Sequence, residues 1–183
     1  MIETELRIRV NDVNKLEKKL TLIGCEYKKT EWQKDTYYDN DVHEIRNTDR
    51  AIRLRQIRLN DAQNITCFVT FKGINMDHVS NVREENEYEI SDLDEYKRKF
   101  LQLGYHPVSP EVEKIRKEYK YGDITVCIDN VKNIGIFMEM EKISEEYSEE
   151  SKKELKELLE LLGYEIDDNI KDSYLDILQK MYE

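Results

Sequence analysis

Charged residues of both signs alternate with apolar ones in the first ten residues of this 183-residue chain. Glu3, Glu5 and Arg7 follow one another at a spacing of two, and aliphatic residues occupy most positions between them. A period of two is typical of a β-strand, because successive side chains point to opposite faces. One face of this strand would be apolar and the other charged. Carboxylates bind divalent metal ions and guanidinium groups bind phosphate, so the charged face could hold a metal-bound phosphate compound.

The same alternation recurs in later segments of the chain. A single charged strand face is most simply a face exposed to water. Six such strands leave two arrangements open: a broad polar sheet, or a barrel of roughly eight strands with the charged faces inside. A closed barrel would imply a charged ligand, because unpaired buried charges lose several kcal/mol of hydration. The recurring positions are Arg53, Arg55, Lys72, Arg83, Glu85, Glu87, Lys114, Arg116, Asp129, Glu139 and Glu141.

The helices and strands that carry these residues are predicted from apolar periodicity and from turn residues. Turn signals such as "RLNDAQN" indicate hairpins, so we expect an α+β fold with a largely antiparallel sheet, formed by a single domain over residues 1–183. Helices are predicted over residues 12–23, 92–103 and 149–162, with a short C-terminal helix at "DSYLDILQKMY". Strands are predicted over residues 1–10, 25–39, 50–59, 65–73, 82–90, 112–121, 123–130 and 135–143.

Composition restricts the possible partners. The net charge of −11 disfavours binding to nucleic acid or to an anionic membrane surface, so any anion site must be a local basic pocket. Apolar runs such as "ITVCI" are too short to span a bilayer, and no export signal leads the chain, so we expect a cytoplasmic protein. Cys25, Cys67 and Cys127 are odd in number and widely spaced, which favours reduced core thiols.

The ensemble of motifs resembles the CYTH superfamily, the triphosphate tunnel metalloenzymes. "IETELRIR" is similar to the family signature E-x-E-x-K, and the other matching motifs follow in the family's order. "QKDTYYD" and residues 83–92 look most like the class IV adenylyl cyclase branch, within the group that also contains thiamine triphosphatases. The resemblance implies an eight-stranded antiparallel closed β-barrel, a tunnel with helices packed outside. The other motifs are "AIRLRQ", "TFKG", "REENEYEISD", "KIRKEY", "CIDNVKNIGIFMEME" and "KDSYLDIL".

The resemblance also implies site residues and a cofactor, Mg²⁺ or Mn²⁺. Arg7, Lys72 and Arg116 would be catalytic, and Arg7 also binds phosphate. Arg7 departs from the signature, which has Lys there; Arg cannot give up its proton, so a mechanism with a general base at this position is in doubt. Glu85 and Glu87 would line the tunnel, touching metal or neutralising nearby bases, and Arg9 and Arg83 would lie nearer a rim. The implied metal ligands are Glu3, Glu5, Asp129, Glu139 and Glu141, and the implied phosphate-binding bases are Arg53, Arg55, Lys72, Lys114 and Arg116.

The implied chemistry is attack on a small-molecule triphosphate, with a class IV adenylyl cyclase favoured. The cyclase would convert ATP to cyclic AMP and pyrophosphate. The alternative is a triphosphatase acting on tripolyphosphate, thiamine triphosphate or a nucleoside triphosphate, because one tunnel can serve both reactions. A non-catalytic triphosphate-binding domain is disfavoured, since binding alone needs fewer metal-side acids. The protein would be a monomer or a homodimer.

Overall fold

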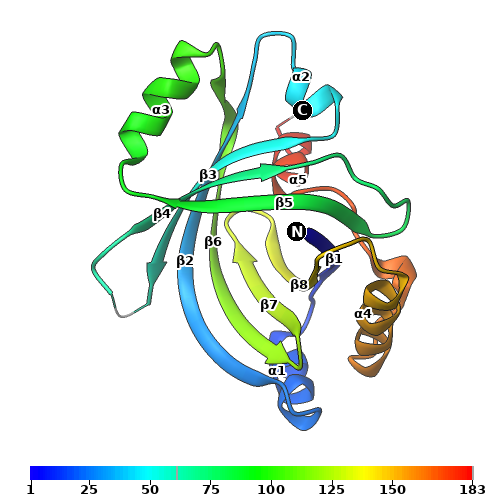
Figure 1. Cartoon of the computed structure of the whole chain (residues 1–183). Helices are drawn as coiled ribbons and strands as arrows, with labels where there is room; N and C mark the ends of the chain where they lie inside the picture. Colours follow the sequence, from blue (N-terminus) through cyan, green and yellow to red (C-terminus); the bar gives the residue numbers. More distant parts are fainter. Residues whose placement is uncertain (61, 183) are drawn as a thin grey trace.

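The strands of the computed structural model close into a barrel with helices around it, as Figure 1 shows. The structure describes residues 1–60 and 62–182, and within them eight strands form the barrel. Neighbouring strands pair in an antiparallel manner throughout, and the pairing of β1 with both β5 and β8 closes the ring. The predicted fold is therefore confirmed. The strands are β1 (Ile2–Arg9), β2 (Glu26–Asp39), β3 (Ala51–Leu59), β4 (Thr66–Lys72), β5 (Asn81–Ile90), β6 (His106–Tyr121), β7 (Ile124–Val131) and β8 (Gly135–Ser144).

Strand β6 is longer than the sequence predicts. It begins at His106 rather than at residue 112, because its first residues pair with the end of β2. Pro107 and Pro110 lie in this stretch, and proline normally favours a loop or an irregular part of a strand. The register between β2 and β6 shifts between Asp35 and Tyr37, so the pairing is irregular where the prolines lie. The predicted turn over residues 58–64 joins β3 to β4, but its Asp61 lies outside the described residues.

The long helices agree with the predicted ranges to within one residue at either end. Asp12, Asp92 and Ser148 cap α1, α3 and α4, each accepting a hydrogen bond from the backbone N–H three residues later. Two short segments escaped prediction, because three or four residues show no apolar periodicity: α2 (Glu44–Asn47) and the 3₁₀ turn Ile166–Asp168. The other helices are α1 (Val13–Leu22), α3 (Leu93–Gln102), α4 (Glu149–Leu161) and α5 (Tyr174–Lys180).

The apolar strand faces point outward, where helices cover them. Leu20 of α1 and Leu158 of α4 pack with Leu6 and Met140 on the outer surface of the barrel. Phe100 of α3 packs over the other side of the barrel, on β2, β3 and β4. This arrangement leaves the charged strand faces pointing inward. Among the described residues, no helix combines the length and apolar character needed to cross a membrane.

Helix α5 occupies a different place from the other helices. Its Tyr174 and Leu178 pack with Val112, Val131 and Phe137 in a separate apolar cluster. Each of these three residues lies an even number of positions from the charged residues of its strand, so its side chain points to the same inner face. Helix α5 therefore packs against the inner face of the barrel at this end. The C-terminal helix is therefore part of the tunnel wall.

Candidate active site

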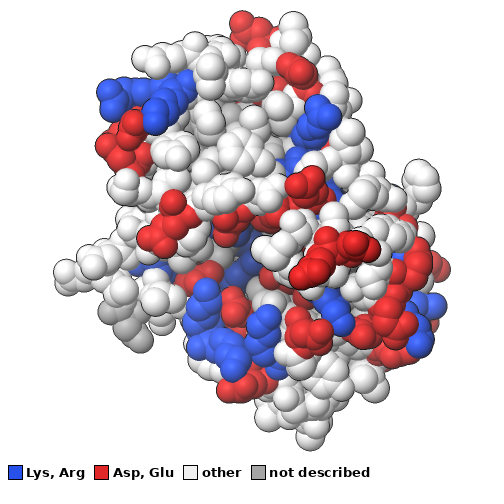
Figure 2. Space-filling view, in the orientation of Figure 1, with Lys and Arg blue, Asp and Glu red and all other residues white. Residues whose placement is uncertain are grey.

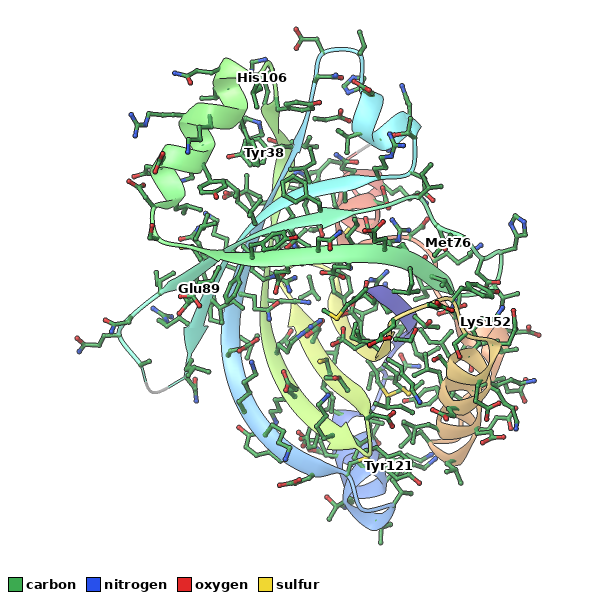
Figure 3. All side chains as sticks on the ribbon, in the orientation of Figure 1. Tyr38, Met76, Glu89, His106, Tyr121 and Lys152 are labelled. Carbon is green, nitrogen blue, oxygen red and sulfur yellow. The ribbon has the colours of Figure 1, made fainter. Side chains whose placement is uncertain are left out.

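A cavity of about 1100 Å³ runs through the barrel interior. Side chains of every strand of the barrel except β7 line it, and Figure 3 shows side chains projecting inward from the ribbon. Figure 2 shows acidic and basic side chains close together on the face that covers the lower barrel. All residues predicted for the site except Asp129 line this cavity: Glu3, Glu5, Arg7, Arg53, Arg55, Lys72, Glu85, Glu87, Lys114, Arg116, Glu139 and Glu141.

The acidic wall of the cavity is formed by β1 and β8. The register places Glu5 directly opposite Glu141, while Arg7 is opposite Glu139. Burial raises the pKa of Glu141, and the nearby carboxylates of Glu139 and Glu5 raise it further against the attraction of Arg116. Like charges on facing strands therefore repel one another here.

The basic wall lies on β3 and on β6, the two neighbours of β2, and its β6 bases reach Glu139 of β8. Arg55 donates two hydrogen bonds to Asp35, from Nε to Oδ1 and from Nη2 to Oδ2, each 2.7 Å long. Arg53 lies 3.6 Å from Asp35 and 3.2 Å from Glu87. Burial opposes ionisation of Asp35, but Arg55 and Arg53 hold the pKa of its carboxyl below the ordinary value. Asp35 therefore keeps two phosphate-binding candidates in place.

Lys72 of β4 lies between the two walls. Its Nζ is 2.7 Å from Glu3 Oε2 and 2.8 Å from Glu85 Oε2. Burial alone would lower the pKa of Lys72, but the two carboxylates raise it overall, so the ammonium group stays charged. Glu85 and Glu87 thus pair with bases, which is one of the two roles considered for them.

Lys114 and Arg116 of β6 share Asp129. Lys114 Nζ donates to Asp129 Oδ2 at 2.7 Å, and Arg116 donates to both oxygens of the same carboxylate. Arg116 also donates to Glu139. Burial and the positive charge of Arg116 lower the pKa of Lys114, against the pull of the two acids. Asp129 is fully buried behind these bases; its assignment as a metal ligand stays a prediction.

Arg7 connects the acidic wall to the C-terminal segment. Its Nη2 donates to Glu5 at 2.7 Å, its Nε donates to Glu139 at 2.8 Å, and its Nη1 donates to the backbone oxygen of Asp172. The guanidinium carbon lies 4.6 Å from the centre of the Tyr174 ring. Burial disfavours the charge, but Glu5 and Glu139 raise the pKa of Arg7 well above its ordinary value. Arg7 is therefore a fixed cation.

Several cavity residues were missed from the sequence. Asp35 and Tyr174 each contact predicted bases, and Tyr174 donates a hydrogen bond to Asp129 at 3.0 Å. Glu31 and Gln33 also line the cavity, and Gln33 donates to Glu31 at 2.6 Å. Glu31, Gln33 and Asp35 alternate at the same spacing of two as the charged strands, which was the available signal. Tyr174 gave no such signal, because it lies on a helix.

Of the two arginines predicted to lie near a rim of the tunnel, one lines the cavity and the other does not. Arg83 lines the cavity and lies 3.7 Å from Asp49. Arg9 does not line it; this guanidinium packs over Phe137 and donates to a backbone oxygen. The three cysteines are free thiols, with Cys127 buried and the other two half-buried.

The carboxylates that line the cavity are chemically suitable ligands for a divalent metal ion. Within the residues that the structure describes, no three His, Cys, Asp or Glu side chains converge as a ready-made ligand cluster. Glu5 and Glu141 nevertheless lie opposite each other, and burial first, then the carboxylates of Glu139 and Glu5, raises the pKa of Glu141. Hard cations such as Mg²⁺ and Mn²⁺ prefer carboxylate oxygens. The assignment of Glu3, Glu5, Glu139 and Glu141 as ligands of such an ion stays a prediction.

Comparison with known proteins agrees with this geometry. The sequence profile of the CYTH domain matches residues 1–174. The chain belongs to the CYTH domain family. A candidate adenylate cyclase of Methanocaldococcus jannaschii is 35% identical over 179 residues, covering 97% of this chain and 98% of the relative. CYTH domains form triphosphate tunnels that act on small-molecule triphosphates and use divalent metal ions.

Solved structures share the fold of this chain. The PH1819 protein of Pyrococcus horikoshii has a TM-score of 0.87 and 31% identity, covering 98% of this chain and 99% of that one. HpAC1 from Hippeastrum, a candidate adenylyl cyclase with a dominant triphosphatase activity, has a TM-score of 0.69 and 18% identity. It covers 98% of this chain and 96% of its own, and at this identity the likeness concerns the fold alone.

Proposed function

We propose that this CYTH protein is a divalent-metal-dependent adenylyl cyclase, which converts ATP to cyclic AMP and pyrophosphate. The observation that carries the proposal is one cavity that holds carboxylates of β1 and β8 together with bases of β3 and β6. A polyanion with its metal ion matches both walls at once. The M. jannaschii relative, described as a candidate adenylate cyclase, supports the cyclase reaction.

The residues of the tunnel have distinct parts in this reaction. Arg53, Arg55 and Arg116 bind phosphate oxygens and stabilise the charge that develops on the departing pyrophosphate. A bound divalent ion would neutralise phosphate charge as a Lewis acid. The ribose 3′-hydroxyl attacks the α-phosphorus, a new P–O bond forms, and the bond to the β-phosphate breaks. Arg7 cannot accept the proton of the attacking hydroxyl, because its guanidinium is always protonated. The proton passes instead to a substrate phosphate oxygen.

Hydrolysis of a triphosphate is the second candidate function. Water would attack the terminal phosphorus in the same cavity, and orthophosphate would leave. The observation that favours it is the fold shared with HpAC1, in which triphosphatase activity is dominant. One fold can therefore serve both reactions, and the product decides between them.

Product analysis tests the proposal directly. The protein is incubated with ATP and, separately, with tripolyphosphate, each with Mg²⁺ or Mn²⁺. Cyclic AMP with pyrophosphate in equal amounts supports the cyclase. Orthophosphate without cyclic AMP supports the triphosphatase, and binding without turnover of either compound supports a non-catalytic triphosphate-binding protein. The variant Arg55→Ala is the control, because activity from the tunnel must fall when this phosphate-binding base is removed.

A further inference from the structure

Two buried polar residues of β2, Glu31 and Gln33, line the cavity and have no part in the reaction described above. Gln33 Nε2 donates a hydrogen bond to Glu31 Oε1 at 2.6 Å. Because a carboxylate only accepts hydrogen bonds, the amide nitrogen must face Glu31, and the amide oxygen must point elsewhere. Within the described part of the chain, no donor reaches this buried oxygen of Gln33. A buried acceptor without a donor is costly, so the oxygen suits a bound molecule that donates a hydrogen bond.

Two of the phosphate-binding candidates lie next to this pair. Strands β2 and β6 are neighbours (Figure 1), and their register places Gln33 opposite Lys114 and Glu31 opposite Arg116. Paired residues of neighbouring strands have Cα atoms about 5 Å apart, and their side chains point to the same face. A phosphate group bound by these two bases therefore lies within side-chain reach of both Glu31 and Gln33.

Lys29 fixes the orientation of the Glu31 carboxylate. Its Nζ lies 2.8 Å from Glu31 Oε2 and 3.5 Å from Glu118 Oε2. Burial alone would lower the pKa of Lys29, but Glu31 and Glu118 raise it overall, so the ammonium group stays charged. Glu31 is thus held by Lys29 through one oxygen and by Gln33 through the other. Carboxylates act as general bases, and a glutamine side chain orients the attacking water in small GTPases.

We propose that Glu31 and Gln33 hold and activate a water molecule, so that the tunnel hydrolyses the terminal phosphate of a triphosphate. The water donates one hydrogen bond to Gln33 Oε1 and the other to the Glu31 carboxylate. Glu31 is the general base, and Gln33 orients the water. This inference deepens the hydrolytic candidate function by naming its residues, and it rests on the tunnel binding a triphosphate.

The hydrolytic step balances with water as the only co-reactant. The water oxygen forms a bond to the terminal phosphorus, which Lys114 and Arg116 hold. The bridging P–O bond breaks, and its electron pair stays on the departing oxygen. One proton of the water passes to Glu31 and then to the solvent. With tripolyphosphate as substrate, the products are orthophosphate and pyrophosphate.

The experiment separates the rate of hydrolysis from binding. Release of orthophosphate from tripolyphosphate with Mg²⁺ gives kcat, and calorimetry gives the Kd of the imido analogue, in which NH replaces the bridging oxygens. In Glu31→Gln, kcat should fall about 10²-fold or more, as expected for the loss of a general base. The Kd should stay within about threefold, because the base acts in the transition state and not in binding. An unchanged Kd also shows that the variant is folded.

The matched control is Glu118→Gln, which removes the same charge from the other carboxylate beside Lys29. This variant should keep kcat within about threefold, because a partly exposed ion pair contributes little. Gln33→Leu removes the oxygen that orients the water and should lower kcat about tenfold or more at an unchanged Kd.

Three results would overturn the inference. The wild type binds the imido analogue but releases no orthophosphate from tripolyphosphate, in which case formation of cyclic AMP from ATP still supports the cyclase. Glu31→Gln and Glu118→Gln lower kcat equally, which would show a general effect of charge at this edge of the cavity. The loss of kcat in Glu31→Gln comes with an equal loss of affinity, which would make Glu31 a binding residue. A wild type that binds neither the imido analogue nor ATP contradicts the proposed function as well.

Discussion

At the scale of single residues, Arg7 decides how the nucleophile can be activated. Arg7→Lys keeps the positive charge and should retain much of the activity, because the variant loses only the bidentate hydrogen bonding of the guanidinium to phosphate. Arg7→Ala should lose far more, about 10²-fold in kcat/KM, and should bind substrate more weakly. Steady-state kinetics across a pH series measures both variants. A hundredfold gain in Arg7→Lys with a new basic-limb pKa would show instead that this position needs a titratable base.

Two glutamates on the same face of β8 have opposite surroundings. Glu139 pairs with Arg7 and Arg116, and these bases with Lys114 hold its pKa well below the ordinary value despite burial; Glu141 has a raised pKa. Both Glu139→Gln and Glu141→Gln should reduce turnover about 10²-fold or more. In urea unfolding with EDTA, Glu139→Gln should lower stability, because it leaves buried cations unpaired, whereas Glu141→Gln should raise it. Equal stability changes in the two variants would contradict this assignment.

Asp35 gives a pH-dependent contribution to stability. Its pKa is lower in the folded protein than in the unfolded chain, so its ion pairs stabilise the fold above the unfolded pKa, and this stabilisation is lost as pH falls through the folded pKa. Asp35→Asn should cost about 3 kcal/mol at pH 7, because buried Arg55 loses its partner. Denaturant unfolding from pH 7 to pH 3 should show the difference from wild type shrinking only at the acid end. A difference that does not depend on pH would indicate a packing effect.

At the scale of elements, α5 holds one end of the tunnel through Tyr174. The Tyr174 hydroxyl bonds Asp129, and the ring lies under Arg7 and 4.9 Å from Lys114. Tyr174→Phe keeps the ring and should cost about 1 kcal/mol in unfolding free energy. Tyr174→Ala also removes the packing with Phe137 and should cost about 3 to 5 kcal/mol. Chemical denaturation checks both values, and equal losses would mean that the ring contributes no packing.

At the scale of the whole molecule, the barrel interior holds charges of both signs, which a metal-bound triphosphate would contact. Tripolyphosphate with Mg²⁺ at about 100 times its Kd should stabilise the fold by about 2.7 kcal/mol. For a chain of this size, the melting temperature should rise by about 5 to 10 °C. EDTA added with the tripolyphosphate should remove most of the rise, and NaCl at matched ionic strength should not reproduce it. A rise that NaCl reproduces would indicate general screening rather than a site.

The local sequence determined the strands, the long helices and which charged residues share one strand face. These follow from spacing, since a period of two assigns Arg53 and Arg55 to one face whatever the rest of the chain does. Tertiary structure alone decided which charges pair. Asp129 turned out to lie behind Lys114 and Arg116, and Tyr174 came to lie under Arg7, a neighbour 167 positions earlier in the chain. Strand order, register and the docking of α5 set those contacts, because they depend on closure of the whole barrel and not on neighbouring residues.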